Sequence, residues 1–208
     1  MEIWATGWAL SRGTPAPVPT EGAFRIEVGL PQHKARYIFP QCSGDVRRLA
    51  ETLYDPEVFI KVCAPPEPVQ ELLPSHWKID RIGFMMTHRF SESREIPTPA
   101  GYTLELASTP PVLTAQVTDS SGLIAASGRI ALVGSFAIYD QIQTHEQHRR
   151  RGLGSVIMNA LREATANHRI DQGLLVATPD GRELYAALGW QMHSLYTTAV
   201  IKPQPQRS

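Results

Sequence analysis

The chain has 208 residues, which is enough for one large domain or two small ones. Hydrophobic residues make up 42% of it, and 20 basic residues balance 20 acidic ones, so neither a nucleic-acid partner nor a membrane partner is expected. There is no long apolar run and no signal-peptide pattern, and we expect a cytoplasmic protein. Cys42 and Cys63 lack metal-ligand spacing, so we expect reduced thiols and no metal site.

The first half of the chain predicts a mixture of strands and helices. In chain order we expect a hairpin at residues 24–30 and 35–39, a helix at 45–54, a strand at 58–63, a short helix at 67–73 and a strand at 79–90. Residues 91–101 are polar and contain two prolines and a glycine near their end, which is typical of a linker. We therefore expect one domain at residues 1–97 and another at residues 98–208.

The second half predicts two strands, at 102–107 and 112–119, separated by only four residues. Two of these four are proline, which leaves no room for a helix. A strand is expected from Ser135 to Thr144, and a helix follows, because one helical face collects its apolar residues: Leu153, Val156, Ile157, Ala160, Leu161 and Ala164. A short apolar strand at 173–178 and a helix that ends at Gly189 come next.

The segment 147–155, Gln-His-Arg-Arg-Arg-Gly-Leu-Gly-Ser, lies between the strand and the helix. Gly152 and Gly154 let the backbone approach a ligand without a Cβ in the way. The first amides of the helix lack intrahelical partners, and with the helix dipole they form an anion site suited to a pyrophosphate. Arg149, Arg150 and Arg151 add charge that can pair with phosphate oxygens. A solvated basic helix start would give the same pattern.

Two motifs in this order resemble the GCN5-related N-acetyltransferase (GNAT) superfamily. Its phosphate loop, Arg/Gln-x-x-Gly-x-Gly/Ala, is matched by Arg149, Gly152 and Gly154, and its later Leu-Tyr-x-x-x-Gly-Phe/Trp signature is matched from Leu184 to Trp190. The resemblance covers about residues 101–201. It implies an α+β fold with a mixed sheet, and acetyl-CoA as the co-substrate.

The first half repeats the second in outline. Residues 59–77 and 174–190 each read as a strand, a short helix and an aromatic-ended segment. We interpret the first half as a degenerate GNAT-like copy without a phosphate loop, giving a tandem fold; an unrelated cap with chance similarity is the alternative. Members of the superfamily carry two helices after their first strand, and these often shape the acceptor site. Because they are missing here, we expect the first half, or dimerisation, to wall that site.

The resemblance also assigns the cofactor contacts. The backbone of Ile142, Gln143 and Thr144 is expected to hold the pantetheine arm and polarise the thioester, although a plain strand would look the same. Thr178 occupies a position where the superfamily often has an asparagine that contacts the cofactor arm. The pyrophosphate is expected at Arg149, Arg150, Arg151, Gly152, Leu153, Gly154 and Ser155.

Tyr185 matches the tyrosine that many members use as general acid to the leaving thiolate. A phenol has an ordinary pKa near ~10, so it is protonated at neutral pH and can donate. An aromatic residue that only packs on a short helix is the alternative.

Asp140 is the candidate base. By the two-residue period of a strand it shares a face with Phe136, Ile138 and Ile142, where a carboxylate is costly without a role or a partner. Its position resembles those where relatives carry a basic Glu or His. A salt bridge to a neighbouring arginine, or a bulge that faces solvent, would also explain it. His145 and Glu146 are second choices for the base.

These features predict an acyl-CoA-dependent N-acyltransferase that moves acetyl from acetyl-CoA to a primary amine of a small molecule, by direct attack in a ternary complex. A non-catalytic acyl-CoA sensor is one alternative, although it would not need Tyr185 or Asp140. An acetyltransferase of a protein or an aminoacyl-tRNA is another, and the balanced charge gives it no support. We expect a monomer or a homodimer.

Overall fold

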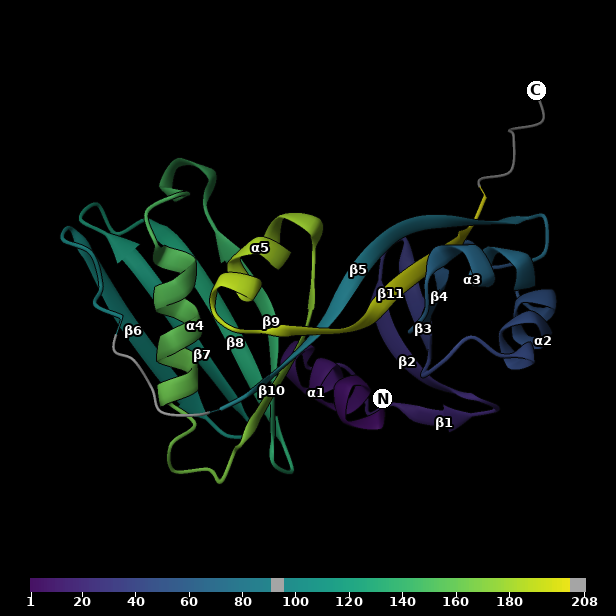
Figure 1. The fold of residues 1–208 in the computed structure, drawn as a ribbon, viewed down its shortest axis with the longest axis horizontal. Coiled ribbons are helices and arrows are strands. Elements are labelled where there is room, and N and C mark those ends of the chain that lie inside the picture. Colours follow the sequence, from purple (N-terminus) through teal and green to yellow (C-terminus); the bar gives the residue numbers. More distant parts are fainter. Residues whose placement is uncertain (91–95, 203–208) are drawn as a thin grey trace.

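A computed structural model describes residues 1–90 and 96–202 (Figure 1). Within these residues, five α-helices and one 3-10 helix accompany a single mixed sheet. The helices are α1 (Glu2–Arg12), α2 (Gly44–Thr52), α3 (Pro66–Leu72), η1 (Glu146–His148), α4 (Leu153–Glu163) and α5 (Pro179–Ala187). The strands are β1 (Val18–Thr20), β2 (Ala23–Leu30), β3 (His33–Phe39), β4 (Val58–Val62), β5 (Trp77–Arg89), β6 (Tyr102–Thr109), β7 (Val112–Asp119), β8 (Ile124–Val133), β9 (Phe136–Thr144), β10 (Gln172–Ala177) and β11 (Gln191–Ile201). The predicted α+β class with a mixed sheet is confirmed.

The sheet is continuous across both halves of the chain, in the order β1-β2-β3-β4-β11-β5-β10-β9-β8-β7-β6. β5 pairs with β10 on one side and with β11 on the other, and β11 also pairs with β4. Each half therefore contributes a strand to the other, and the long strands β5 and β11 cross the middle of the molecule in Figure 1. The division at residues 97 and 98 stays a prediction, and residues 91–95 of the expected linker lie outside the described residues.

Both halves contain the same succession of elements. β3, α2, β4, α3 and β5 follow one another as β9, α4, β10, α5 and β11 do, and in each set the helix joins two parallel strands. The two sets differ in η1, which precedes only α4, and in how far their parallel strands are paired. β3 and β4 pair over five residues, whereas β9 and β10 pair over only three. The interpretation of the first half as a degenerate copy stays a prediction.

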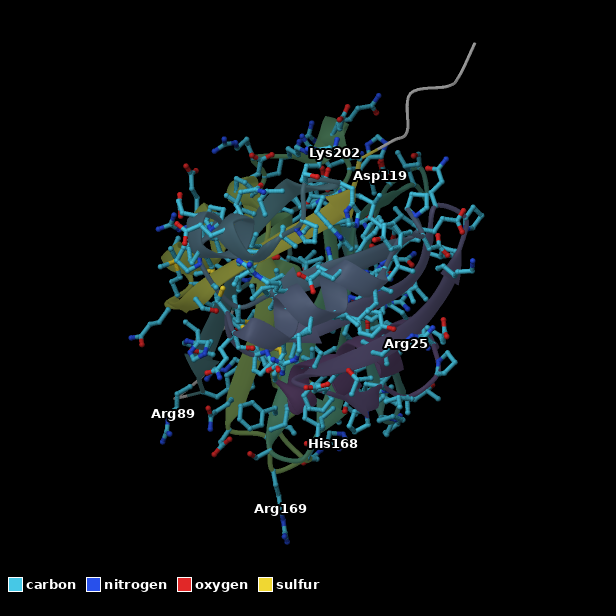
Figure 2. The ribbon with its side chains drawn as sticks, turned by 90° about the vertical axis from the view of Figure 1, so that its right-hand side faces the viewer. Arg25, Arg89, Asp119, His168, Arg169 and Lys202 are labelled. Carbon is cyan, nitrogen blue, oxygen red and sulfur yellow. The ribbon has the colours of Figure 1, made fainter. Side chains whose placement is uncertain are left out.

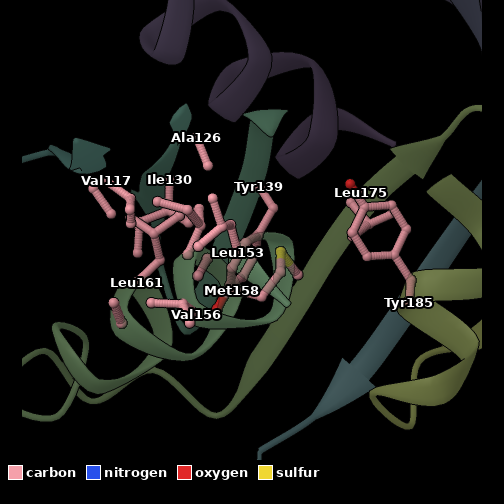
Figure 3. Close-up of a cluster of buried hydrophobic side chains, with 14 of the residues drawn as sticks. Val117, Ala126, Ile130, Tyr139, Leu153, Val156, Met158, Leu161, Leu175 and Tyr185 are labelled. Carbon is pink, nitrogen blue, oxygen red and sulfur yellow. The ribbon is translucent and has the colours of Figure 1, made fainter. Parts of the chain in front are cut away.

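Three apolar clusters hold the sheet and helices together. The first lies under α4, where the predicted helical face packs on β7, β8 and β9; Figure 3 shows Leu153, Val156 and Leu161 among the strand residues Val117 and Ile130. The second joins α2 and α3 to the first half of the sheet. The third lies under α1. Because β9 sends Tyr139 into the α4 cluster and Ile138 into the α1 cluster, α1 and α4 cover opposite faces of that strand.

The sequence did not predict helix α1, and it reaches the second half of the molecule. Trp4, Ala5 and Trp8 are buried in its cluster, and α1 packs on β8 and β9 as well as on β2. The contact with β9 is close: a Cβ added at Gly7 would lie 2.1 Å from Cγ1 of Ile138. An N-terminal helix therefore covers the face of β8 and β9 opposite α4, and the role of the first half as a wall of the acceptor site stays a prediction.

Charged side chains lie at both ends of the molecule, and the two cysteines are free. Arg89 and Arg169 project into solvent at the lower end of the molecule in Figure 2, and Asp119 and Lys202 lie at the upper end. Cys42 and Cys63 form no disulfide. Over the described residues, no group of three or more ligating side chains is arranged to hold a metal ion, and no helix is long and apolar enough to cross a membrane.

Candidate active site

A β-bulge interrupts β9 three residues before its end. Gln143 is the partner of Ser127 and Asp140 is the partner of Arg129, so Gln141 and Ile142 together lie opposite Gly128 on β8. Gln141 has a φ of 55°, a left-handed value that is uncommon outside glycine. A bulge adds one residue to one strand and reverses the faces beyond it.

Because of the bulge, the expectation that Ile142 shares a strand face with Asp140 is wrong. Ile142 does not share a face with Asp140: it packs with the α4 cluster, whereas Asp140 lies on the α1 face. The glycine opposite the bulge makes room for this, since a Cβ at Gly128 would lie 2.5 Å from Cδ1 of Ile142 and 2.7 Å from Cγ2 of Ile157. Two-residue periodicity failed here because it assumes an uninterrupted strand.

Next to the bulge, β9 and β10 separate. They are paired only from Gln172 to Leu174 on β10, which meet Phe136 to Ile138 on β9. Beyond Leu174, β10 remains bonded to β5 up to Ala177, and β9 remains bonded to β8. The carboxyl end of β9 therefore has backbone groups with no strand on its β10 side, and a chain-like ligand could bond to them. Ile142, Gln143 and Thr144 lie on this edge.

The glycine-rich loop follows this edge directly. Arg150 has a φ of 61° and Gly152 a φ of 78°, and Gly152 is the N-cap of α4. No side chain caps this helix, so its first amides are open to a ligand. Nothing lies within 4 Å of a Cβ added at Gly152, whereas one at Gly154 would lie 2.9 Å from Cδ2 of Leu184. Gly154 therefore also lets α5 approach α4.

A polar network that the sequence did not predict supports the loop. Tyr102 and Asp119 are opposite each other at the open end of the β6–β7 hairpin, and His148 lies between them and the loop. The Tyr102 hydroxyl is 2.9 Å from Nδ1 of His148, and Nε2 of His148 is 3.5 Å from Oδ2 of Asp119. Nη1 of Arg151 donates to the same Tyr102 hydroxyl at 2.8 Å. One of the three loop arginines is thus fixed before any ligand arrives.

The other two loop arginines are less constrained. Arg149 lies 3.8 Å from a carboxylate oxygen of Glu146, and both side chains are exposed, so this pair contributes little. The side chain of His145 accepts a hydrogen bond from the backbone amide of Gln147 and begins η1. His145 and Glu146 therefore lie in the turn that leads into the loop.

Tyr185 is buried, with 8% of its surface exposed, and it belongs to the α4 cluster. Its ring reaches from α5 toward β10 in Figure 3, and it lies 6.2 Å from the ring of Trp190. Burial, reinforced by the negative charge of Asp140, raises the pKa of Tyr185 to about 12. The phenol is therefore a proton donor at neutral pH, and Asp140 is near enough to act on it.

Asp140 binds the end of α1. Nε and Nη2 of Arg12 donate to its two oxygens at 2.7 and 2.9 Å, and the Ser11 hydroxyl donates to Oδ2 at 2.6 Å. Nη1 of Arg129, its neighbour on β8, donates to the Ser11 carbonyl. The salt bridge to an arginine that the sequence left open is present, and the role of base stays a prediction.

Thr178 lies where β10 leads into α5. Its hydroxyl accepts a hydrogen bond from the backbone amide of Gly181 at 3.2 Å, so it is the N-cap of α5. An N-cap of this kind fixes the start of the helix that carries Tyr185. The cofactor contact predicted for Thr178 stays a prediction.

Comparisons with known proteins identify the fold that holds these features. Residues 124–198 match the family model described as FR47-like protein. A GCN5-related N-acetyltransferase from Kribbella flavida superposes with a TM-score of 0.68 at 12% identity, over 96% of this chain and 95% of that one. The protein has the GNAT fold.

Other structures of the GNAT superfamily are also similar. A putative GNAT acetyltransferase from Novosphingobium aromaticivorans has a TM-score of 0.61 at 15% identity, covering 98% of this chain and all of that one. A tandem GNAT protein from the clavulanic acid biosynthesis pathway has a TM-score of 0.54 at 15% identity, over 78% of this chain and 69% of that one. No curated protein sequence matches the chain. All three solved structures share their fold with this chain at 15% identity or less.

Proposed function

We propose that this GNAT protein transfers acetyl from acetyl-CoA to a primary amine of a small molecule, by direct attack in a ternary complex. The observation that carries the proposal is the opening between β9 and β10, which ends at the uncapped start of α4. A pantetheine arm can bond to the exposed edge of β9 while its pyrophosphate meets the first amides of α4. An acyl-CoA has both groups, in this order.

The proposed mechanism needs a donor for the leaving thiolate. The backbone of Ile142, Gln143 and Thr144 would hold the pantetheine arm and polarise the thioester, as amides that face a developing oxyanion do. Tyr185 would then donate its proton to the sulfur as the carbon–sulfur bond breaks. Its raised pKa keeps it protonated at neutral pH, and its burial excludes water that could compete as donor.

The amine would approach from the α1 face. The end of α1 lies beside Asp140 there, and it would wall the acceptor site in place of the missing helices. Asp140 is the proposed proton acceptor for the amine, directly or through water. Its pairing with Arg12 opposes this role, because an acceptor that already holds two N–H donors is less available.

Acetyl-CoA binding by calorimetry and thiol release across a panel of amines test the function. Gly152→Asp should abolish coenzyme A binding, because it adds a negative charge where the pyrophosphate approaches. Gly134→Asp is the matched control: it is also a left-handed glycine with nothing within 4 Å of an added Cβ, but it lies in the turn between β8 and β9. Normal coenzyme A binding by Gly152→Asp would show that the site is wrong; binding without turnover on any amine would favour a sensor.

A further inference from the structure

Two buried basic side chains lie on the α1 face of the first half. Lys61 on β4 and Arg36 on β3 are 8% and 9% exposed. Among residues 1–90 and 96–202, no carboxylate lies within ion-pair distance of either side chain. The nearby carboxylates already form ion pairs with other residues: Asp80 pairs with Arg81, and Asp140 pairs with Arg12. Burying unpaired charge is costly, and burial lowers the pKa of Lys61 to about 7; an anion bound here would offset that cost and favour the charged ammonium.

The unsatisfied groups of this cluster are all hydrogen-bond donors. Arg36 stacks on Trp8 at 3.7 Å, and its Nη2 lies 3.4 Å from Nδ1 of His33. Burial, with a contribution from Arg36, lowers the pKa of His33 to about 3, so the ring is neutral. Because Nδ1 faces a guanidinium it is the acceptor, and the ring proton is on Nε2. Within the part of the chain that the structure describes, neither His33 Nε2 nor Arg36 Nε has a hydrogen-bond partner.

Lys61 adds further donors to the same place. Its Nζ donates to the Thr198 hydroxyl at 2.8 Å, and an ammonium group has two more N–H bonds to give. Stacking on Trp8 holds Arg36, and stacking on Phe59 at 4.2 Å holds His33. The donors are therefore fixed in position, which lowers the entropic cost of binding an acceptor-rich group.

The cluster lies near Arg12 and also contacts Phe59, whose side chain lines an open hollow. At one end is Arg12, which acts electrostatically on Lys61 and Arg36 and which binds Asp140. Beyond Phe59 is a hollow of about 360 Å³, whose charged lining residues are Lys78, Asp80 and Arg81. A ligand whose amine lies near Asp140 would extend its far end toward Lys61.

We propose that Lys61, Arg36 and His33 form a subsite for a carboxylate or phosphate group of the acceptor. The substrate is then a primary amine that carries an anion at its other end. This inference rests on the proposed transfer reaction for its amine, but the anion subsite exists without it. Carboxylate and phosphate share the chemistry that matters here: negative charge and several acceptor oxygens for fixed N–H donors.

The subsite can be tested without acetyl-CoA. Succinate and inorganic phosphate are titrated into the protein at constant ionic strength, with sodium chloride as the reference, and binding is followed by calorimetry and by the unfolding temperature. At least one anion should bind and raise the unfolding temperature, and Lys61→Met should abolish this effect. Lys34→Met is the control, because Lys34 is exposed and pairs with Asp55. If neither anion binds better than chloride, or if Lys61→Met binds like the wild type, the proposal is overturned.

Transfer kinetics then link the subsite to the acceptor. Acceptor amines are compared in two pairs, each with one member that carries the anion and one that lacks it: 4-aminobutyrate with its amide, and phosphoethanolamine with ethanolamine. We expect a KM about tenfold or more lower for the charged member of one pair, lost in Lys61→Met with the neutral member unchanged. The pair that shows it identifies carboxylate or phosphate. Equal KM values within both pairs would refute the inference. Anion binding that depends on Lys61, with no transfer to any amine, would support the subsite and refute the proposed reaction.

Discussion

Replacing Asp140 by Asn tests whether this carboxylate anchors α1 to β9. Asn is nearly isosteric, but it loses the charge that binds Arg12 through two hydrogen bonds and Ser11 through a third. The carboxylate is 10% exposed and the Arg12 side chain is 33% exposed, so solvent screens the pair only in part. Breaking a charge-assisted pair of this kind should cost about 1–2 kcal/mol of unfolding free energy.

For a chain of this size, such a loss corresponds to a fall of roughly 2–8 °C in the unfolding temperature. Thermal unfolding followed by circular dichroism measures it. Arg12→Met closes a double-mutant cycle, in which the two changes together should cost about 1 kcal/mol less than their sum. Glu27→Gln is the control, because it breaks the exposed pair with Arg25. An unchanged unfolding temperature in Asp140→Asn, with no coupling to Arg12, would refute the anchoring of α1 to β9.

Three further predictions concern catalysis, the loop and pH. Tyr185→Phe should leave acetyl-CoA affinity nearly unchanged and lower turnover roughly 10²-fold or more; alkaline pH should restore Asp140→Asn, by freeing the amine, but not Tyr185→Phe, and equal recovery in steady-state assays would contradict these roles. Tyr102→Phe releases both Arg151 and His148 and should weaken coenzyme A binding about tenfold by calorimetry, and full affinity would show that the network is not needed. Burial lowers the pKa of Lys61 to about 7, while the unfolded chain keeps it near ~10.4, so the unfolded state binds more protons between these values and stability should rise with pH there. Lys61→Met should be roughly 1–4 kcal/mol more stable at pH 7 and should lose that rise in denaturant unfolding.

The features that the sequence predicted well are local. The apolar face of α4 repeats with the helical period and Gly152 precedes it, so the helix and its loop follow from neighbouring residues, whereas the anion site stays a prediction. Helix α1 was missed because no side chain caps its first turn. Its buried residues pack on strands that lie far along the chain, so they do not stand out in the local sequence. The bulge at Gln141 has no glycine to mark it.

The polar networks could not be read from the sequence because their members are distant in it. Tyr102 meets His148 only after the β6–β7 hairpin has formed and η1 has folded onto it. Lys61 meets Thr198 across 137 positions, and only because β11 lies beside β4. Single-residue patterns give the chemistry of each group, but pairing over such separations depends on the whole sheet.

The position of β11 also has a consequence for how the chain folds during synthesis. β11 leaves the ribosome after every other strand of the sheet, yet it lies between β4 and β5. Until it arrives, both of those strands present unpaired edges, which are templates for pairing with another chain. The sheet cannot close progressively from its N-terminal side, and its central contacts are non-local, which slows folding. The nascent protein therefore passes through a stage with exposed edges, during which a chaperone that shields β4 and β5 would raise the yield of native molecules.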